Sequence, residues 1–239
     1  HSARTTRAFN MFLRLSEKRA TMLRNTDALR REESGVQMFV TFEGCEGVGK
    51  STQLSLLREY MRETGQEAVF VREPGGTEIS EQIRKIILDP ANRDMTAETE
   101  ALLYAAARAQ LVRTVIRPAL DAGKTVICDR YIDSSVAYQG FARGLGRGFV
   151  EKVNAYAMET AMPDVTVFID LRPSSAFRSV SRNDRLEQEN ISFHDKVYEG
   201  YIAQSAASNG RFVMIKPEKE RLETHRKILD ALKKRGAVK

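Results

Sequence analysis

The sequence predicts an α/β fold in which a five-stranded parallel sheet is flanked by helices. Five short runs of β-branched and aliphatic residues alternate with longer segments that have helical periodicity. The short runs are almost continuously apolar, as expected of strands that are buried on both faces. Regular alternation of strand and helix is typical of right-handed βαβ units, which build parallel sheets.

The elements follow one another with short connections. The five strand candidates are Phe39–Glu43, Ala68–Val71, Thr125–Cys128, Val165–Asp170 and Arg211–Ile215. Helices are predicted at Lys50–Glu63, Glu78–Leu88, Thr96–Ala122, Phe149–Ala161, Glu187–Ala207 and Pro217–Lys234. Pro217 would stand in a first turn, where its missing N–H costs nothing. Pro118, inside the third helix, predicts a kink or an early stop.

The first 37 residues differ from the rest of the chain. They contain no proline and only scattered apolar residues, whereas a strand begins abruptly after Met38. We therefore separate an N-terminal extension, 1–37, from a single domain at 38–239. We interpret the extension as a tag, a misassigned start or an appended helix. Its arginines are also typical of an organelle-targeting presequence, but such presequences contain few acidic residues, and this segment has four.

Composition narrows the function classes. The net charge is +6, and the extension, with eight basic and four acidic residues, carries +4 of it. A protein that binds small polyanions explains this charge as well as a DNA-binding protein does. No apolar run reaches the roughly 18 residues of a membrane span. Cys45 and Cys128 form no CxxC or zinc-type spacing, which favours a reducing, cytoplasmic location.

A phosphate-binding loop is the strongest motif. Residues 44–51 match GxxxxGK[ST] at every fixed position, between a predicted strand and a predicted helix. Glycines at these positions let backbone N–H groups turn toward an anion. Lys50 is expected to reach the β- and γ-phosphates of ATP, and the Ser51 hydroxyl to ligate Mg²⁺. The ATP-binding residues predicted are Gly44, Cys45, Glu46, Gly47, Val48, Gly49, Lys50, Ser51 and Thr52.

A second feature is the pair Asp129-Arg130 at the end of the third strand. Ligands of open α/β folds bind at the carboxyl ends of the strands. A guanidinium there can bridge donor and acceptor phosphates, because its planar fork binds oxygens bidentately. A phosphate loop combined with this pair predicts a phosphotransferase.

Some nucleotide-binding classes fit poorly, and two alternatives stay open. The chain has no NKxD motif, which a GTP-dependent switch would need, and it lacks the further motifs of transporter or helicase ATPases. Another nucleoside monophosphate or deoxynucleoside kinase would share both features above. The other alternative is a non-enzymatic nucleotide-binding module, recruited to nucleic acid through its basic extension.

Several segments together resemble bacterial thymidylate kinase. They come in that family's order and spacing from Met38 to about Ile215, and they are Phe42–Thr52, Arg72–Thr77, Tyr104–Arg108, Asp129–Gly140 and Asp184–Glu189. The resemblance implies a P-loop nucleoside monophosphate kinase fold. It also implies transfer of phosphate from ATP to dTMP with Mg²⁺, giving dTDP for dTTP biosynthesis, and a homodimer packed through helices.

The resemblance also implies roles for single residues. Glu46 would accept a hydrogen bond from the deoxyribose 3′-OH. Arg84 and Arg130 would clamp the acceptor phosphate, while Arg72 would orient its loop. Around the base and sugar, the expected contacts are stacking by Tyr104, a bond from Arg108 to O4, packing of Tyr138 under C2′, and polar contacts from Ser134, Ser135 and Gln139.

The catalytic arginine is expected in a lid at about 177–186. In one subgroup of thymidylate kinases the phosphate loop itself carries an arginine, but Glu46-Gly47-Val48 has none. The lid would then supply the positive charge, with Arg178, Arg182 and Arg185 as candidates, next to Lys50 and Arg130 as further catalytic residues. We also considered that Cys45, beside the phosphate loop, makes activity oxidant-sensitive, against the alternative of inert packing.

Overall fold

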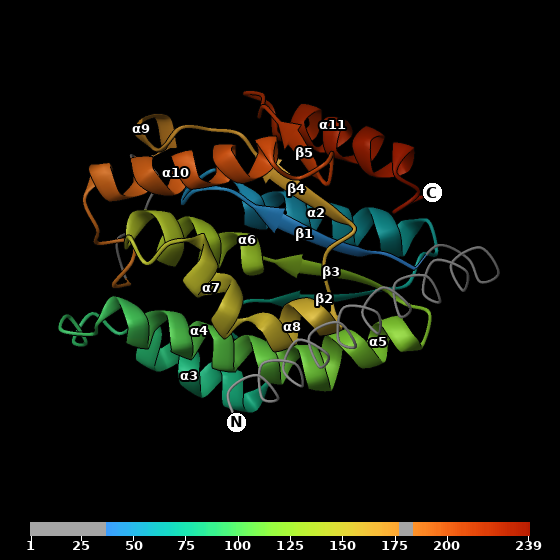
Figure 1. Cartoon of the computed structure of the whole chain (residues 1–239). Coiled ribbons are helices and arrows are strands. Elements are labelled where there is room, and N and C mark those ends of the chain that lie inside the picture. Colours follow the sequence, from blue (N-terminus) through green and yellow to red (C-terminus); the bar gives the residue numbers. More distant parts are fainter. Residues whose placement is uncertain (1–36, 177–183) are drawn as a thin grey trace, which may run out of the picture. The chain divides into compact units, whose positions relative to one another are not determined.

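The computed structural model describes residues 37–176 and 184–239. The chain divides into two units, His1–Gln37 and Met38–Lys239, and the description below concerns the second. Its centre is a five-stranded sheet of the order β2-β3-β1-β4-β5, in which all neighbours are parallel (Figure 1). The strands are β1 Phe39–Glu43, β2 Ala68–Arg72, β3 Thr125–Asp129, β4 Val165–Ile169 and β5 Phe212–Ile215. The predicted fold class is confirmed.

Helices cover both faces of the sheet (Figure 1). The α-helices are α2 Lys50–Glu63, α3 Glu78–Leu88, α4 Ala97–Leu111, α5 Arg117–Asp121, α6 Ile132–Ser135, α7 Arg147–Val153, α8 Ala155–Thr160, α9 Pro173–Ala176, α10 Ile191–Ala206 and α11 Arg221–Lys234. Two π-helical segments, η1 Val112–Ile116 and η2 Val136–Ala142, lie between them. Side chains of β1 point to both faces of the sheet. Phe39 packs with α4 and η1 on one face, whereas Val40 and Phe42 pack with α2 and α11 on the other.

Two predicted helices are interrupted. The third does not stop at Pro118 but passes through η1 and continues as α5 to Asp121. A π-turn shifts the hydrogen-bond ladder by one residue, which accommodates a proline that has no N–H to donate. The fourth is divided into α7 and α8 at Asn154, whose amide nitrogen donates to the Val150 carbonyl oxygen and competes with the backbone ladder.

Two predicted helix starts were wrong. The fifth helix begins at Ile191 rather than Glu187, because the Asn190 side chain accepts the N–H of Phe193 and caps the helix there. The sixth begins at Arg221, so Pro217 lies in the preceding loop instead of in a first turn. The sequence analysis also missed the short helix α6 and the segment η2, which follow β3 directly.

The sheet brings the two predicted phosphate-binding segments together. β1 and β3 are neighbours in the sheet, with Phe42 opposite Asp129, so the phosphate loop and Arg130 leave the sheet side by side. Within the described residues, no helix is long and apolar enough to cross a membrane.

Candidate active site

The phosphate loop follows β1 and ends at the N-terminus of α2. Gly44 has a φ of 147°, and a Cβ at this position would lie 3.0 Å from Val48 Cγ2 and 3.1 Å from the Ile169 carbonyl oxygen, so only glycine fits. Gly49 provides the N-cap of α2 with a φ of 91° and without any side chain that caps the first N–H groups. These N–H groups and the positive end of the helix dipole therefore form an anion site.

Lys50 is buried at the base of this loop. Its Nζ donates to the carbonyl oxygens of Gly44, at 3.0 Å, and Cys45, at 2.8 Å. The pKa of Lys50 is lowered by burial and by the nearby Arg130, and Glu46 and Asp129 oppose this shift only in part. The lysine thus lies close to Arg130 and Glu46, two further predicted site residues.

Arg130 adopts a left-handed backbone conformation, with a φ of 66°. Such a φ is unfavourable for a residue with a Cβ by about 1–2 kcal/mol. Hydrogen bonds on both sides hold it: the N–H of Arg130 donates to the Phe42 carbonyl oxygen, and the thiol of Cys128 donates to the carbonyl oxygen of Arg130. Next to it, the N–H of Tyr131 donates to Glu43. The backbone is fixed in a conformation that directs the guanidinium toward the phosphate loop.

The Arg130 guanidinium contacts both the phosphate loop and Tyr138. It donates to the Gly44 carbonyl oxygen at 2.9 Å and pairs with Glu46 Oε1 at 2.9 Å. The Tyr138 hydroxyl donates to the same Oε1 at 2.9 Å, and the guanidinium lies 5.4 Å from the centre of the Tyr138 ring. The structure thus brings three predicted site residues into direct contact.

The charge state of Glu46 follows from this arrangement. Burial favours the protonated carboxyl, but Arg130, Lys50 and the Tyr138 hydroxyl outweigh burial and lower the pKa of Glu46 to about 2. Within residues 37–176 and 184–239, no group donates to Oε2 of Glu46. An ionised carboxylate with one open oxygen can accept a hydrogen bond from a sugar hydroxyl.

A second carboxylate, Glu43, lies behind Arg130, and the sequence analysis missed it. Its Oε2 accepts from the hydroxyls of Ser134, at 2.6 Å, and Tyr201, at 2.9 Å. Burial and the nearby Asp133 raise the pKa of Glu43 to about 7, although Arg130 opposes them. Ser134 is therefore engaged inside the protein as well as being a predicted base contact. The sequence did contain one signal for Glu43, because it is a charged residue at the end of an otherwise largely apolar strand.

Arg72 and Arg84 shape the loop between β2 and α3. Arg72 pairs with Glu81 at 2.9 Å, and Glu81 also accepts the N–H of Gly76 at 2.8 Å. The Arg84 guanidinium donates to the Pro74 carbonyl oxygen at 2.9 Å. Burial and Arg72 lower the pKa of Arg84. These contacts agree with a loop-orienting role for Arg72, and the phosphate contact of Arg84 stays a prediction.

Tyr104 and Arg108 lie one turn apart on α4. The Arg108 side chain is only 1% exposed, pairs with Glu73 at 2.7 Å and donates to Asn154 Oδ1 at 2.5 Å. Its guanidinium also lies 5.2 Å from the centre of the Tyr131 ring. Tyr104 is half-buried. Arg108 is therefore firmly held by protein groups, and its predicted bond to a base O4 remains a prediction.

The last predicted substrate contacts, Ser135 and Gln139, are both buried. The Ser135 hydroxyl is buried and has no hydrogen-bond partner among the described residues. The amide nitrogen of Gln139 donates to Glu100 Oε1 at 2.8 Å.

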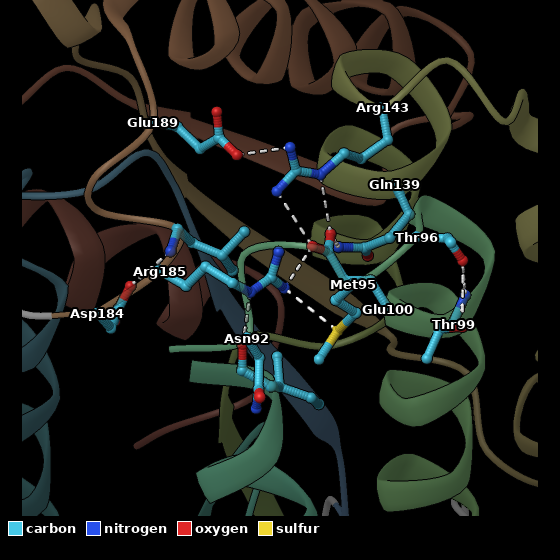
Figure 2. Close-up of polar contacts among 12 residues, drawn as sticks. Asn92, Met95, Thr96, Thr99, Glu100, Gln139, Arg143, Asp184, Arg185 and Glu189 are labelled. Atoms are coloured by element: carbon cyan, nitrogen blue, oxygen red, sulfur yellow. Dashed lines mark hydrogen bonds and ion pairs between the residues drawn. The ribbon is translucent and has the colours of Figure 1, made fainter. Parts of the chain in front are cut away.

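Arg185 belongs to the same buried group as Gln139, shown in Figure 2. It pairs with Glu100 Oε2 at 2.5 Å and donates to the Ile87 carbonyl oxygen at 3.0 Å. Because these bonds commit the guanidinium to α3 and α4, the structure disfavours the catalytic role predicted for Arg185. Arg178 and Arg182 lie outside the described residues, and the role of Arg182 stays a prediction.

Both cysteines are buried. Burial raises the pKa of Cys45 to about 12, against the effects of Lys50 and Arg130. Burial also raises the pKa of Cys128. The thiolate is the reactive form, so these environments favour inert packing over the oxidant-sensitive role considered for Cys45.

Comparison with known proteins points to one family. A family model described as thymidylate kinase matches residues 42–228. The thymidylate kinase of Thermoanaerobacter sp. (strain X514) is 46% identical over 198 residues, covering 82% of this chain and 97% of the relative. That of Bacillus pumilus is 43% identical over 206 residues, with the same coverage. The crystal structure of thymidylate kinase from Ehrlichia chaffeensis superimposes with a TM-score of 0.69 at 29% identity, covering 82% of this chain and 98% of that one.

Proposed function

The chain belongs to the thymidylate kinase family, which phosphorylates dTMP to dTDP with ATP, and from this premise we propose how its residues carry out the transfer. One observation supports the proposal most. Glu46, Arg130 and Tyr138 come from the phosphate loop, from the end of β3 and from η2, and they contact one another. An acceptor bound against them would lie beside the phosphates of ATP.

Two of these side chains would select the sugar of the acceptor. The open Oε2 of Glu46 would accept the 3′-OH of a deoxyribose. Tyr138, whose hydroxyl is held by Glu46, would pack under C2′ and leave no room for a ribose hydroxyl. Arg84 and Arg130 would clamp the acceptor phosphate, and Tyr104 would stack on the thymine, with polar contacts from Ser134, Ser135, Gln139 and Arg108.

ATP would bind along residues 44–52, and Mg²⁺ would neutralise phosphate charge as it does in other P-loop kinases. The residues present fit the ion. Ser51 is exposed at the start of α2, and the buried Oδ1 of Asp129 has no hydrogen-bond partner among the described residues. A hydroxyl and a carboxylate are ligands that Mg²⁺ accepts, with water and phosphate oxygens completing its shell. In the described part of the chain, no group of three metal-binding side chains forms a full protein cage.

Transfer of the phosphoryl group needs no covalent enzyme intermediate. Lys50 and Arg130 would align the donor and acceptor phosphates and neutralise the charge that spreads over the phosphoryl oxygens. Because Glu46 is ionised and holds Arg130, the guanidinium is oriented before substrates bind. Less reorganisation is then needed during the reaction.

A coupled assay of ADP release tests the proposal. With dTMP as the acceptor we expect full turnover, and with dCMP, AMP and thymidine little or none; dUMP, which lacks only the 5-methyl group, should be intermediate. Equal turnover with another nucleoside monophosphate would contradict the assigned acceptor site. A second measurement, on a chain lacking residues 1–37, asks whether the extension binds DNA, and unchanged kinase activity is expected there.

We also propose a homodimer in the cytoplasm. Three apolar side chains on α3 and α4, Ile79, Ile86 and Leu102, are each about half exposed, at 52%, 49% and 52%, and such residues suit a helical interface. Two unpaired cysteines suit a reducing compartment. Light scattering on the purified protein tests the dimer, and a charged residue at Ile86 should make it monomeric.

A further inference from the structure

Glu100, on the first turn of α4, is the centre of a buried ionic cluster and was not among the predicted site residues. Its Oε1 accepts from Gln139 at 2.8 Å and from Arg143 at 3.3 Å. Its Oε2 accepts from Arg143 at 3.1 Å and from Arg185 at 2.5 Å (Figure 2). The side chain of Glu100 is 1% exposed. Both oxygens therefore accept hydrogen bonds from protein donors.

The cluster keeps this carboxylate charged. Burial raises the pKa of Glu100, but Arg143, Gln139 and Arg185 outweigh burial and hold the pKa below its usual range. An ionised carboxylate can only accept hydrogen bonds. Gln139 must then approach it with the amide nitrogen, since the reversed amide would bring two oxygens together. Because Gln139 is only 1% exposed, its amide cannot turn away into solvent.

This bond connects the two elements that carry the predicted acceptor contacts. Glu100 lies one turn before Tyr104 on α4, so the two side chains share a helix face. Gln139 follows Tyr138, which contacts Glu46 in the phosphate loop. The bond to Glu100 uses one N–H of the Gln139 amide and fixes which way the amide faces, so that its carbonyl oxygen, Oε1, remains as an acceptor for a ligand beside the second N–H.

A hydrogen-bond acceptor at this place would distinguish between pyrimidine bases. Thymine presents an N–H donor at position 3, whereas cytosine presents an unprotonated nitrogen there. A carbonyl oxygen facing position 3 would bind the first base and repel the second. A site built to hydrogen-bond a donor discriminates strongly against an analogue that lacks it.

We infer that Glu100 is a positioning residue for base specificity: it fixes the Gln139 amide so that Oε1 accepts the N3–H of the thymine. The inference rests on the proposed placement of the base beside Gln139. Arg143 and Arg185 act one step further away, because they hold Glu100 in the acceptor-only state.

The test is the Glu100→Gln variant. A glutamine at position 100 can donate as well as accept, so the Gln139 amide can turn and present its nitrogen to the base. With dTMP and 5-methyl-dCMP as acceptors, we expect the preference for dTMP in kcat/KM to fall roughly tenfold. The change should come from a higher KM for dTMP, with kcat and the KM for ATP within about twofold of the parent, as expected when ground-state binding is lost.

A purely structural role would give a different result. The variant would then lose activity with both acceptors in proportion, and an unchanged preference in a folded variant would overturn the inference. If the parent itself does not phosphorylate dTMP, the proposed function fails instead, so the two failures can be told apart. Glu98→Gln, an exposed change on the same helix, is the matched control and should leave every constant unchanged.

A double-mutant cycle makes the test independent of folding losses. In the Gln139→Ala background, Glu100→Gln should no longer alter the preference, because no amide remains to be oriented. Equal effects of Glu100→Gln in both backgrounds would contradict the inference. Glu100→Asp, which remains acceptor-only, should keep most of the preference. An unchanged preference in Gln139→Ala would also overturn the inference, since it would exclude any reading of N3–H by the amide.

Discussion

Glu46 and Glu100 are two carboxylates held ionised by basic side chains, but only one of them remains open to a ligand. Glu46, in the phosphate loop, has 24% of its side chain exposed and uses a single oxygen for Arg130 and Tyr138. Glu100, on α4, is 1% exposed and uses both oxygens for protein donors. Both have a pKa below the usual range for the same reason, because nearby cations outweigh burial.

The difference lies in hydrogen-bond capacity rather than in charge. A buried carboxylate whose two oxygens are saturated orders its neighbours, and removing one partner exposes the remaining charge to an apolar interior. A carboxylate with an unused oxygen can still bind substrate. Loss of Arg130, the partner of Glu46, should therefore mainly lower turnover. Loss of Arg185, a partner of Glu100, should mainly lower the stability of the fold.

The largest expected effect is that of Arg130→Ala. Removing the guanidinium that contacts the phosphate loop should lower kcat by roughly 10²–10³, as found when one preorganised donor to the transition state is removed. ATP binding should persist, because Lys50 and the loop N–H groups remain. Steady-state kinetics and nucleotide titration measure the two separately. The exposed Arg113→Ala is the control, and near-normal turnover of Arg130→Ala would refute the bridging role.

The Arg185→Ala variant tests the other half of the comparison. Glu100 would keep Arg143 but lose its shortest ion pair, and we expect the free energy of unfolding to fall by about 3 kcal/mol. Urea denaturation measures the loss. Turnover below the unfolding transition should fall much less than in Arg130→Ala. If Arg185→Ala instead loses as much kcat as Arg130→Ala, Arg185 is catalytic after all and the comparison is wrong.

Glu43 sharpens the comparison, because it is fully buried but its pKa is raised to about 7 by burial and by Asp133. The folded protein then holds a proton that the unfolded chain releases, so stability from this group is complete below about pH 4.5 and is lost as the pH rises through 7. The loss would be up to about 3 kcal/mol. Glu43→Gln cannot ionise, and urea denaturation at pH 5 and pH 8 should show a smaller decrease for it than for the parent. If the free energy of unfolding decreases equally in both proteins, the group that holds the proton is not Glu43.

The smallest effect is expected for Tyr138→Ala, which leaves Glu46 ionised but opens space at the sugar. Discrimination between dTMP and its ribonucleotide counterpart should decrease about tenfold, since a packing contact of this kind contributes 1–3 kcal/mol to specificity. Competition kinetics with both acceptors measures it. Tyr156→Ala removes an exposed tyrosine and should leave the preference unchanged. Undiminished discrimination in Tyr138→Ala would count against the packing argument.

The sequence predicted the fold well where burial determines the pattern. The predicted ends of all five strands differ from the observed ones by one residue at most. β1, β3 and β4 are buried runs, whereas the edge strands β2 and β5 are only partly buried. Helix ends were predicted less well, because single side chains decide them. Asn190 caps α10 and Asn154 interrupts the helix before β4, and neither effect follows from hydrophobic periodicity.

The site could be predicted only as far as its motifs reach. The phosphate loop and the Asp129-Arg130 pair are local patterns, and they meet because β1 and β3 are neighbours. The partners of Arg108 and Arg185 are Glu73 and Glu100, which lie 35 and 85 residues away along the chain. No spacing rule connects such residues, so the sequence could not reveal that Arg185 is buried in an ion pair rather than free to reach a phosphate.

The left-handed backbone of Arg130 sets a limit for protein engineering. Glycine adopts a φ of this kind without steric penalty, so a search for thermostable variants by backbone relaxation would select position 130. The gain would be offset, because Arg130 pairs with Glu46 and donates to Gly44, and its removal would leave that partly buried carboxylate without its cation. Selection on backbone strain alone would therefore choose a substitution whose cost it does not count, and which removes the guanidinium proposed to bridge the phosphates.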